Sequence, residues 1–214
     1  MGLNQDLKQC LKKAYDRCIK FQDDCVDMCW NPSIGHIPRG FCGASGDLKE
    51  VELVLVFAEP GKPKRGDLPT DFESAYECTM NAFRTPKYKF HKNVRMILNM
   101  CWPPSSFNFD EQMRKVWLTE SVLCSAKEVC GSVSPDTSNA CGERYLRKQL
   151  LLFPNALIVA LGKKAQNRMD DLQISYFSVH HPAPPEGNKP RAISSWEKIP
   201  IELEKRRQGL QHQS

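Results

Sequence analysis

Four short apolar runs divide the chain, and each is typical of a β-strand. They are rich in aliphatic, β-branched and aromatic residues, and Pro or Gly follows closely after three of them, as is usual where strands end in turns. The runs span residues 52–57, 116–123, 156–161 and 174–179. Residues 30–46 are instead rich in Gly and Pro, and we expect a loop there.

Segments with helical periodicity lie between these runs and on both sides of them. Apolar residues recur at three- and four-residue spacing over residues 6–28, which predicts an amphipathic helix. Further helices are predicted at residues 71–83, 91–100, 139–153, 163–171 and 193–207. Strands separated by helices indicate a parallel sheet covered on both faces. The predicted fold is therefore α/β, with three αβα layers around a central, mainly parallel four-stranded sheet.

The pattern contains neither an internal repeat nor a long linker, so residues 1–214 are expected to form a single domain, with a flexible tail at about 205–214. No apolar run approaches the roughly 20 residues that span a bilayer. The first residues lack the apolar core of a secretory signal. These features predict an intracellular protein, either cytoplasmic or associated with the nucleoid or nucleus.

The formal charge of +5 is mildly basic and does not by itself identify a partner. The basic residues are grouped, however. Lys62, Lys64 and Arg65 form one cluster, and residues 84–92 form a second in which aromatic residues alternate with cations. Cations that neutralise phosphates beside rings that stack on bases are used to bind single strands or flipped bases. A solvated surface loop is the alternative for either cluster.

Two histidines, His180 and His181, follow the last predicted strand and precede a Pro-rich loop. Strand ends are where α/β folds place their chemistry. A histidine held there can donate a hydrogen bond to the charge that develops on a leaving group. The alternative is a structural histidine packed beside prolines.

Ten cysteines are many for an intracellular chain. Disulfides are rare inside cells, so metal binding, a cluster or plain packing must explain them. No CxxC pair is present, but Cys25 and Cys29 form a CxxxC pair that would place both thiols on one helical face or at a helix end. Zinc ligand pairs usually have two to four intervening residues, so this spacing alone does not establish a metal site.

Five short motifs occur in a fixed order between residues 50 and 185. They are residues 57–61 (Phe-Ala-Glu-Pro-Gly), 89–90 (Lys-Phe), 118–124 (Leu-Thr-Glu-Ser-Val-Leu-Cys), 154–162 (Pro-Asn-Ala-Leu-Ile-Val-Ala-Leu-Gly) and 181–183 (His-Pro-Ala). In order and spacing they resemble the uracil-DNA glycosylase superfamily, and within it the bacterial and archaeal iron–sulfur type.

The resemblance implies a DNA glycosylase of base-excision repair, which hydrolyses the N-glycosidic bond of a flipped uracil or another deaminated base. Phe90 would stack on the base, and His181 rather than His180 would donate to its O2, because neighbouring residues of a strand face opposite sides. Pro60 and Gly61 would line the base pocket. The cations that would bind phosphates are Lys62, Lys64, Arg65, Lys189 and Arg191. The protein would act on DNA as a monomer and would not bind a membrane.

Two departures from the family pattern bear on catalysis. The family has Gly-Glu where Phe57 and Ala58 stand, so Glu59 carries the carboxylate one place later. Glu120 stands where the family has the Asn that reads uracil. An ionised Glu only accepts hydrogen bonds, so it would suit the amino group of a cytosine-like base. Glu59 and Glu120 are both candidate catalytic carboxylates.

The resemblance also gives the cysteines a role. Cys124 and Cys141 fall where the iron–sulfur type has its last two ligands, and Cys25 and Cys29 are the best first pair. Together they are candidate ligands of a 4Fe-4S cluster, which takes four thiolates. Ordinary buried thiols are the alternative.

Three classes of function stay open from the sequence. The first is a base-excision glycosylase. The second is a nucleic-acid-binding relative of the same fold that has lost the chemistry, which the two departures favour. The third is an unrelated α/β enzyme that handles phosphate, against which the lack of a GxxxxGK[ST] loop counts.

Overall fold

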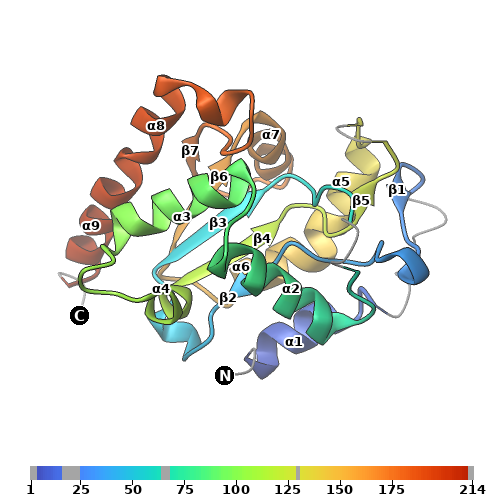
Figure 1. Cartoon of the computed structure of the whole chain (residues 1–214), viewed down its shortest axis with the longest axis horizontal. Helices are drawn as coiled ribbons and strands as arrows, with labels where there is room; N and C mark the ends of the chain where they lie inside the picture. The colour runs from blue at the N-terminus through green and yellow to red at the C-terminus, as the bar shows by residue number, and fades with distance from the viewer. Residues whose placement is uncertain (1–3, 16–24, 64–67, 129–130, 212–214) are drawn as a thin grey trace.

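A five-stranded sheet forms the centre of the protein (Figure 1). The computed structural model describes residues 4–15, 25–63, 68–128 and 131–211. In this part of the chain the strand order is β2-β4-β3-β6-β7. The strands are β2 (Cys42–Gly43), β3 (Leu53–Phe57), β4 (Val116–Glu120), β6 (Leu157–Leu161) and β7 (Phe177–Val179).

The four strands that the sequence predicts all exist, and they run parallel to one another. β3 and β6 begin one residue later than predicted, and the other two strands are three residues shorter. β4 ends at Glu120 instead of residue 123, and β7 begins at Phe177 instead of residue 174. The backbone N–H of Ile174 donates to the carbonyl of Met169 in the preceding helix, so residue 174 caps the end of that helix instead of starting the strand.

The strand β2 corrects the prediction of four strands. It lies in the segment expected to be a loop and pairs antiparallel with the outer edge of β4. Gly43 makes this pairing possible, because its φ is +102° and an added Cβ would lie 2.1 Å from the carbonyl oxygen of Val116. A strand of two residues is too short to show an alternating pattern in the sequence.

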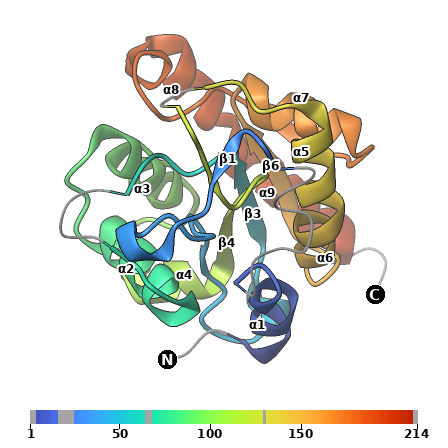
Figure 2. The ribbon, with the colours of Figure 1, turned by 90° about the vertical axis from the view of Figure 1, so that its right-hand side faces the viewer.

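Helices cover both faces of the sheet. They are α1 (Gln5–Lys12), α2 (Phe72–Arg84), α3 (Lys89–Cys101), α4 (Phe109–Lys115), α5 (Pro135–Cys141), α6 (Arg147–Leu150), α7 (Lys163–Asp171), α8 (Pro190–Trp196) and α9 (Lys198–Gln211). Figure 2 shows α2, α3 and α4 on one side of the sheet and α5, α6 and α7 on the other. The predicted three-layer arrangement is therefore confirmed.

The N-terminal helix differs from its prediction. α1 ends at Lys12, and residues 16–24 lie outside the described part of the chain. Cys25 and Cys29 do not share a helix, because residues 28–29 form the extended strand β1 (Met28–Cys29). β1 pairs antiparallel with β5 (Ser125–Ala126), about 100 residues later. The expected helical CxxxC arrangement is wrong because this long-range pairing replaces the local helix.

Two other helical predictions change, and α4 is a helix that the apolar pattern does not predict. α4 is held by a capping box between Asn108 and Glu111. The predicted helix 139–153 begins earlier, at Pro135, and contains a π-helical turn at Gly142–Leu146. The C-terminal helix is divided into α8 and α9. α9 continues to Gln211, so residues 205–211 are helical instead of an irregular tail, and residues 212–214 lie outside the described part.

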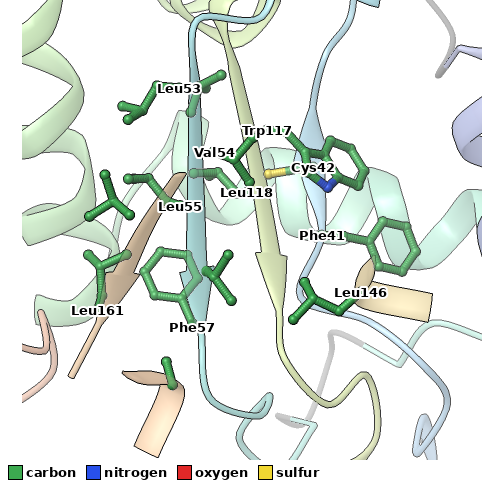
Figure 3. Packing of buried hydrophobic residues seen from close by; sticks show 14 of the residues in the cluster. Phe41, Cys42, Leu53, Val54, Leu55, Phe57, Trp117, Leu118, Leu146 and Leu161 are labelled. Atoms are coloured by element: carbon green, nitrogen blue, oxygen red, sulfur yellow. The ribbon is translucent and has the colours of Figure 1, made fainter. Parts of the chain in front are cut away.

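The core surrounds β3. Figure 3 shows Leu53, Leu55 and Phe57 of β3 beside Trp117 and Leu118 of β4. All five residues of β3 are buried, as expected for a strand covered on both faces. Among the described helices, none is long and apolar enough to cross a membrane. The rigid sheet places the carboxyl ends of β3, β4, β6 and β7 at one edge, where open α/β sheets bind their ligands.

Candidate active site

The residues that follow the four parallel strands gather at one edge of the sheet. Phe57 and Glu120, the last residues of β3 and β4, are paired neighbours in the register, so their side chains lie on the same face. Gly162 follows β6, and its backbone N–H donates to the carbonyl of Val179 at the end of β7. His180 and His181 come next.

Phe90 connects the first and last of these strand ends. It lies in the first turn of α3 and is half-buried. Its ring centroid is 6.1 Å from that of His181 with an interplanar angle of 29°, and 5.1 Å from that of Phe57 in an edge-to-face contact. The structure therefore brings Phe57, Phe90 and His181 into one row, with Glu120 beside Phe57.

The hydrogen bonds of His181 define which ring nitrogen carries the proton. The backbone N–H of Ala183 donates to Nδ1 of His181 at 3.1 Å, so Nδ1 is an acceptor and a neutral ring has its proton on Nε2. Burial lowers the pKa of His181, although the charges of Glu186 and Glu59 act in the opposite direction. At neutral pH His181 is thus a neutral imidazole that offers an Nε2–H donor.

Gly162 makes room for His181. Its φ is +88°, and an added Cβ would lie 2.6 Å from the Cβ of His181. A side chain at this turn would push the histidine away from Phe90. The Leu-Gly end of β6, which the sequence analysis used only as part of a motif, is therefore a direct requirement of the site.

Glu186 and Asn93 hold the loop that carries the two histidines. Glu186 binds Nδ1 of His180 at 2.7 Å and accepts the backbone N–H of His181 at 3.2 Å. The amide of Asn93, on α3, donates to the carbonyls of Pro182 at 2.7 Å and Gly187 at 3.0 Å. Sequence reasoning missed both residues. For Asn93 a signal existed, because it is a polar residue on the apolar face of α3 next to Val94.

Glu59 is held by two cations from α7. Its Oε1 is 2.8 Å from Nζ of Lys164, and its Oε2 is 2.6 Å from Nη2 of Arg168. Arg168 is buried and also donates from Nη1 to the carbonyl of Ala58 at 2.6 Å and to the hydroxyl of Ser121 at 3.0 Å. The arginine therefore ties the turn after β3 to the end of β4. No sequence pattern marked Lys164 or Arg168.

Glu120 is buried and stands without a polar partner. Within the part of the chain that the structure describes, its carboxyl makes no hydrogen bond or ion pair, and Oε2 is fully enclosed. The side chain lies against Gly40, where an added Cβ would be 2.9 Å from Oε1. Burial and the nearby charge of Glu59 raise the pKa of Glu120 well above its usual range, against the opposing charges of Arg168 and Arg39.

Hydrogen bonds to the Gly61 carbonyl hold the turn at Pro60 and Gly61 in place. The Gly61 oxygen accepts from the guanidinium of Arg39 and from the hydroxyl of Ser125 at 3.0 Å, and Arg39 in turn donates to Ser125 at 2.6 Å. No described atom lies within 4 Å of the position a Gly61 Cβ would occupy. This turn borders open space, and Arg39 is a further residue that the sequence analysis missed.

Exposed cations surround this edge. Lys62 follows the Gly61 turn, Lys89 precedes Phe90, and Lys189 and Arg191 follow the histidine loop. The side chains of all four are exposed. The predicted phosphate-binding residues Lys64 and Arg65 lie outside the described residues.

Comparison with known protein families gives a match. The family model of the Uracil DNA glycosylase superfamily matches residues 70–201, more than half of the chain. The chain belongs to the uracil DNA glycosylase superfamily. Members of this superfamily are typically DNA glycosylases, which are hydrolases of DNA repair. No curated protein matches the chain.

The superfamily match covers only part of the candidate site. Phe90, Glu120 and His181 lie within it, as do Cys124 and Cys141. The turn that carries Glu59, Pro60 and Gly61 precedes it, as do Cys25 and Cys29. The described structure joins these two parts through the Glu59–Arg168 ion pair and through the hydrogen bond from Ser125 to Gly61.

For the iron–sulfur type of this superfamily, the decisive residues are the cysteines. Cys25, Cys124 and Cys141 line one pocket, although they come from three distant segments. Cys29 lies on β1 opposite Ser125, which follows Cys124. A 4Fe-4S cluster takes four thiolates. Among the described residues, however, no group of three or more His, Cys, Asp or Glu side chains is arranged to hold a metal ion.

Proposed function

We propose that this chain is a DNA glycosylase of base-excision repair that hydrolyses the N-glycosidic bond of a flipped uracil or another deaminated base. The observation that carries the proposal is the stacked pair of Phe90 and His181, in which the histidine offers an Nε2–H donor beside an aromatic platform. Membership of the superfamily supports the same reaction class.

His181 would act at the moment the sugar–base bond breaks. The base must leave the stack before its sugar can be reached, and the half-buried ring of Phe90 gives it a surface to stack on. The bond's electron pair then moves onto the base, and negative charge collects on its O2. A preorganised Nε2–H from His181 stabilises this charge without transferring its proton. Water adds to the sugar carbon and loses a proton to solvent, while the base leaves and is protonated.

Glu59 would stabilise the positive sugar and orient the water. A carboxylate has about four lone-pair positions, and Lys164 and Arg168 together occupy two of them. Its charge also reaches the rest of the site, because Glu59 raises the pKa of both His181 and Glu120. Its fixed position would therefore serve the active site as well as the fold.

Lys62, Lys89, Lys189 and Arg191 would bind the DNA backbone. Each lies within eight residues of a site motif in the sequence, and each side chain is exposed. Contacts to phosphates position the duplex and carry no base information. This leaves base choice to the residues around Phe90. Lys64 and Arg65 stay predicted members of this group.

We also propose that Cys25, Cys29, Cys124 and Cys141 hold a 4Fe-4S cluster. The support is that three of these thiols line one pocket and the fourth lies on the strand paired with β5. When bound, the cluster would supply a covalent link between the N-terminal segment, β5 and α5. The proposed hydrolysis uses Phe90, His181 and Glu59 and routes no step through the cluster.

The proposed reaction is tested with oligonucleotides, single- and double-stranded, that carry uracil, hypoxanthine, xanthine or a mismatched thymine. Base release is read as strand cleavage after alkaline treatment. Release of at least one of these bases, abolished when Phe90 is replaced by Ala, is the expected result. Binding of the same DNA without release of any base would instead favour the degenerate relative. The pairing of Glu59 with two cations and the Glu at position 120 are the observations that favour that alternative.

A further inference from the structure

Glu120 differs from the other carboxylate of the site. Glu59 binds two cations, whereas the Glu120 carboxyl has no hydrogen-bond or ion-pair partner among the described residues. Its residue is only 6% exposed. An ionised carboxylate in such a place would carry an uncompensated buried charge, which is strongly unfavourable. A neutral acid needs a partner less, but it still has one donor and one acceptor to offer.

Among the described residues, three charged groups face Glu120 from the surrounding elements, and none of the three pairs with it. Arg168, from α7, is occupied by Glu59, Ala58 and Ser121. Arg39, from the loop before β2, donates hydrogen bonds to the Gly61 carbonyl, to the Ser125 hydroxyl and to two carbonyls of its own loop. Glu59, after β3, repels a second negative charge. The net effect of burial and of these charges is a strongly raised pKa for Glu120.

The position of Glu120 suits contact with a stacked base. Glu120 shares a sheet face with Phe57, Phe57 contacts Phe90, and Phe90 contacts His181. A pyrimidine stacked on Phe90 with its O2 toward His181 has the neighbouring edge, which carries N3 and the C4 substituent, free for another residue. Glu120 is the buried polar group without a partner at the β4 end of this row.

We propose that Glu120 reads the N3–C4 edge of a flipped pyrimidine as a neutral carboxylic acid. This inference rests on the proposed glycosylase function. The acid donates through its O–H and accepts through its carbonyl, as an amide does. Its ligand is a pyrimidine with one donor and one acceptor on that edge. Uracil presents O4 and N3–H, and cytosine presents the reverse, N3 and the N4 amino group.

This proposal changes the expectation drawn from the sequence alone. There Glu120 was an ionised group that only accepts hydrogen bonds. Its burial makes it a donor as well, so that it can replace the reading amide of the superfamily without losing contact with O4. Base reading then depends on pH, because the donor disappears when Glu120 ionises.

The first test compares the native protein with the Glu120→Gln variant, whose amide has the same length and never ionises. Single-turnover base release is measured on single-stranded oligonucleotides carrying either uracil or cytosine, from neutral to alkaline pH. We expect the native rate to fall, relative to the rate of the variant, about tenfold per pH unit above the pKa of Glu120. The ratio of the two rates removes the ionisation of uracil itself, which affects both proteins equally.

The two substrates identify which edge is read. Release of uracil would mean that the acid proton of Glu120 points toward O4, and release of cytosine would mean that it points toward N3. Either result supports a neutral acid, provided that at alkaline pH the rate of the native protein falls relative to the rate of the Glu120→Gln variant. Identical pH profiles for the native protein and Glu120→Gln would overturn the proposal.

The second test measures protonation without catalysis. Because the pKa of Glu120 is raised in the folded state, its contribution to the free energy of unfolding is full at low pH and is lost as pH rises toward the folded pKa. Urea unfolding of the native protein should show this decline, and Glu120→Gln should not. Equal slopes of the unfolding free energy against pH in the two proteins would overturn the proposal that Glu120 is a neutral acid. The expected slopes together with no base release at any pH would refute the glycosylase function and, with it, the reading role.

Discussion

The backbone N–H of Ala183 donates to Nδ1 of His181, two residues earlier in the chain, at 3.1 Å. This contact leaves Nε2 as the position of the proton in the neutral ring. The same ring is stacked on Phe90. A tight turn in the Pro-rich loop therefore determines which ring nitrogen carries the proton and how the proposed donor is oriented.

Replacing His181 by Ala should lower single-turnover base release by roughly 10²–10³-fold, because that is the usual loss on removing one preorganised donor. His180→Ala is the control, since His180 binds Glu186 instead of stacking on Phe90. A large loss in His180→Ala with an unchanged His181→Ala would reverse the assignment.

The tautomer of His181 can be measured directly. We expect ¹⁵N chemical shifts typical of an Nε2–H imidazole at neutral pH. Because burial lowers the pKa of His181, the ring should become charged only at a pH below that of an exposed histidine. An Nδ1–H signal, or a pKa above the ordinary value, would contradict the arrangement with Ala183.

The ion pair between Glu59 and Arg168 should matter for folding as well as for the site. Both side chains are almost fully buried, and Arg168→Ala would remove the buried cation of Glu59 and one donor to the Ala58 carbonyl and to the Ser121 hydroxyl. We expect a loss of about 3–5 kcal/mol in the free energy of unfolding, as for other broken buried pairs.

Lys164→Ala is the matched control, because it removes the other cation of Glu59 from a side chain that is 46% exposed. Its effect should stay within about 1 kcal/mol. Urea unfolding followed by circular dichroism measures both variants. Equal losses for the two would show that the burial of Arg168 does not decide its contribution.

Gly162→Ala should displace His181. An added Cβ meets the histidine at 2.6 Å, and the φ of +88° strains any other residue by about 1–3 kcal/mol. The expected result is a loss of both stability and base release. Gly209→Ala, where no described atom lies within 4 Å, is the control. Full activity in Gly162→Ala would mean that the loop adapts without moving the donor.

The cluster proposal predicts a colour. Protein purified without oxygen should be brown, with broad visible absorbance and equal amounts of iron and sulfide. Replacing Cys25, Cys124 or Cys141 by Ser should remove the colour, and Cys78→Ser on α2 should keep it. Colourless protein that contains no iron after anaerobic reconstitution would refute the cluster.

The sequence alone determined the frame of the protein. The four apolar runs became the parallel strands β3, β4, β6 and β7, because a strand buried on both faces needs a continuous apolar segment. The motif order also located Phe90 and His181, which the structure brings together. These features depend on local pattern, or on the rule that parallel strands end at the same edge.

The tertiary structure decided which polar groups meet. Glu59 finds Lys164 and Arg168 more than 100 residues later, and Cys29 is extended because β1 pairs with β5. The sequence predicts an ionised Glu120, but its chemistry changes because no side chain among the described residues pairs with its buried carboxyl. Periodicity reports which side of an element is apolar, whereas a polar partner, and the pKa that depends on it, is set by contacts between segments distant in the chain.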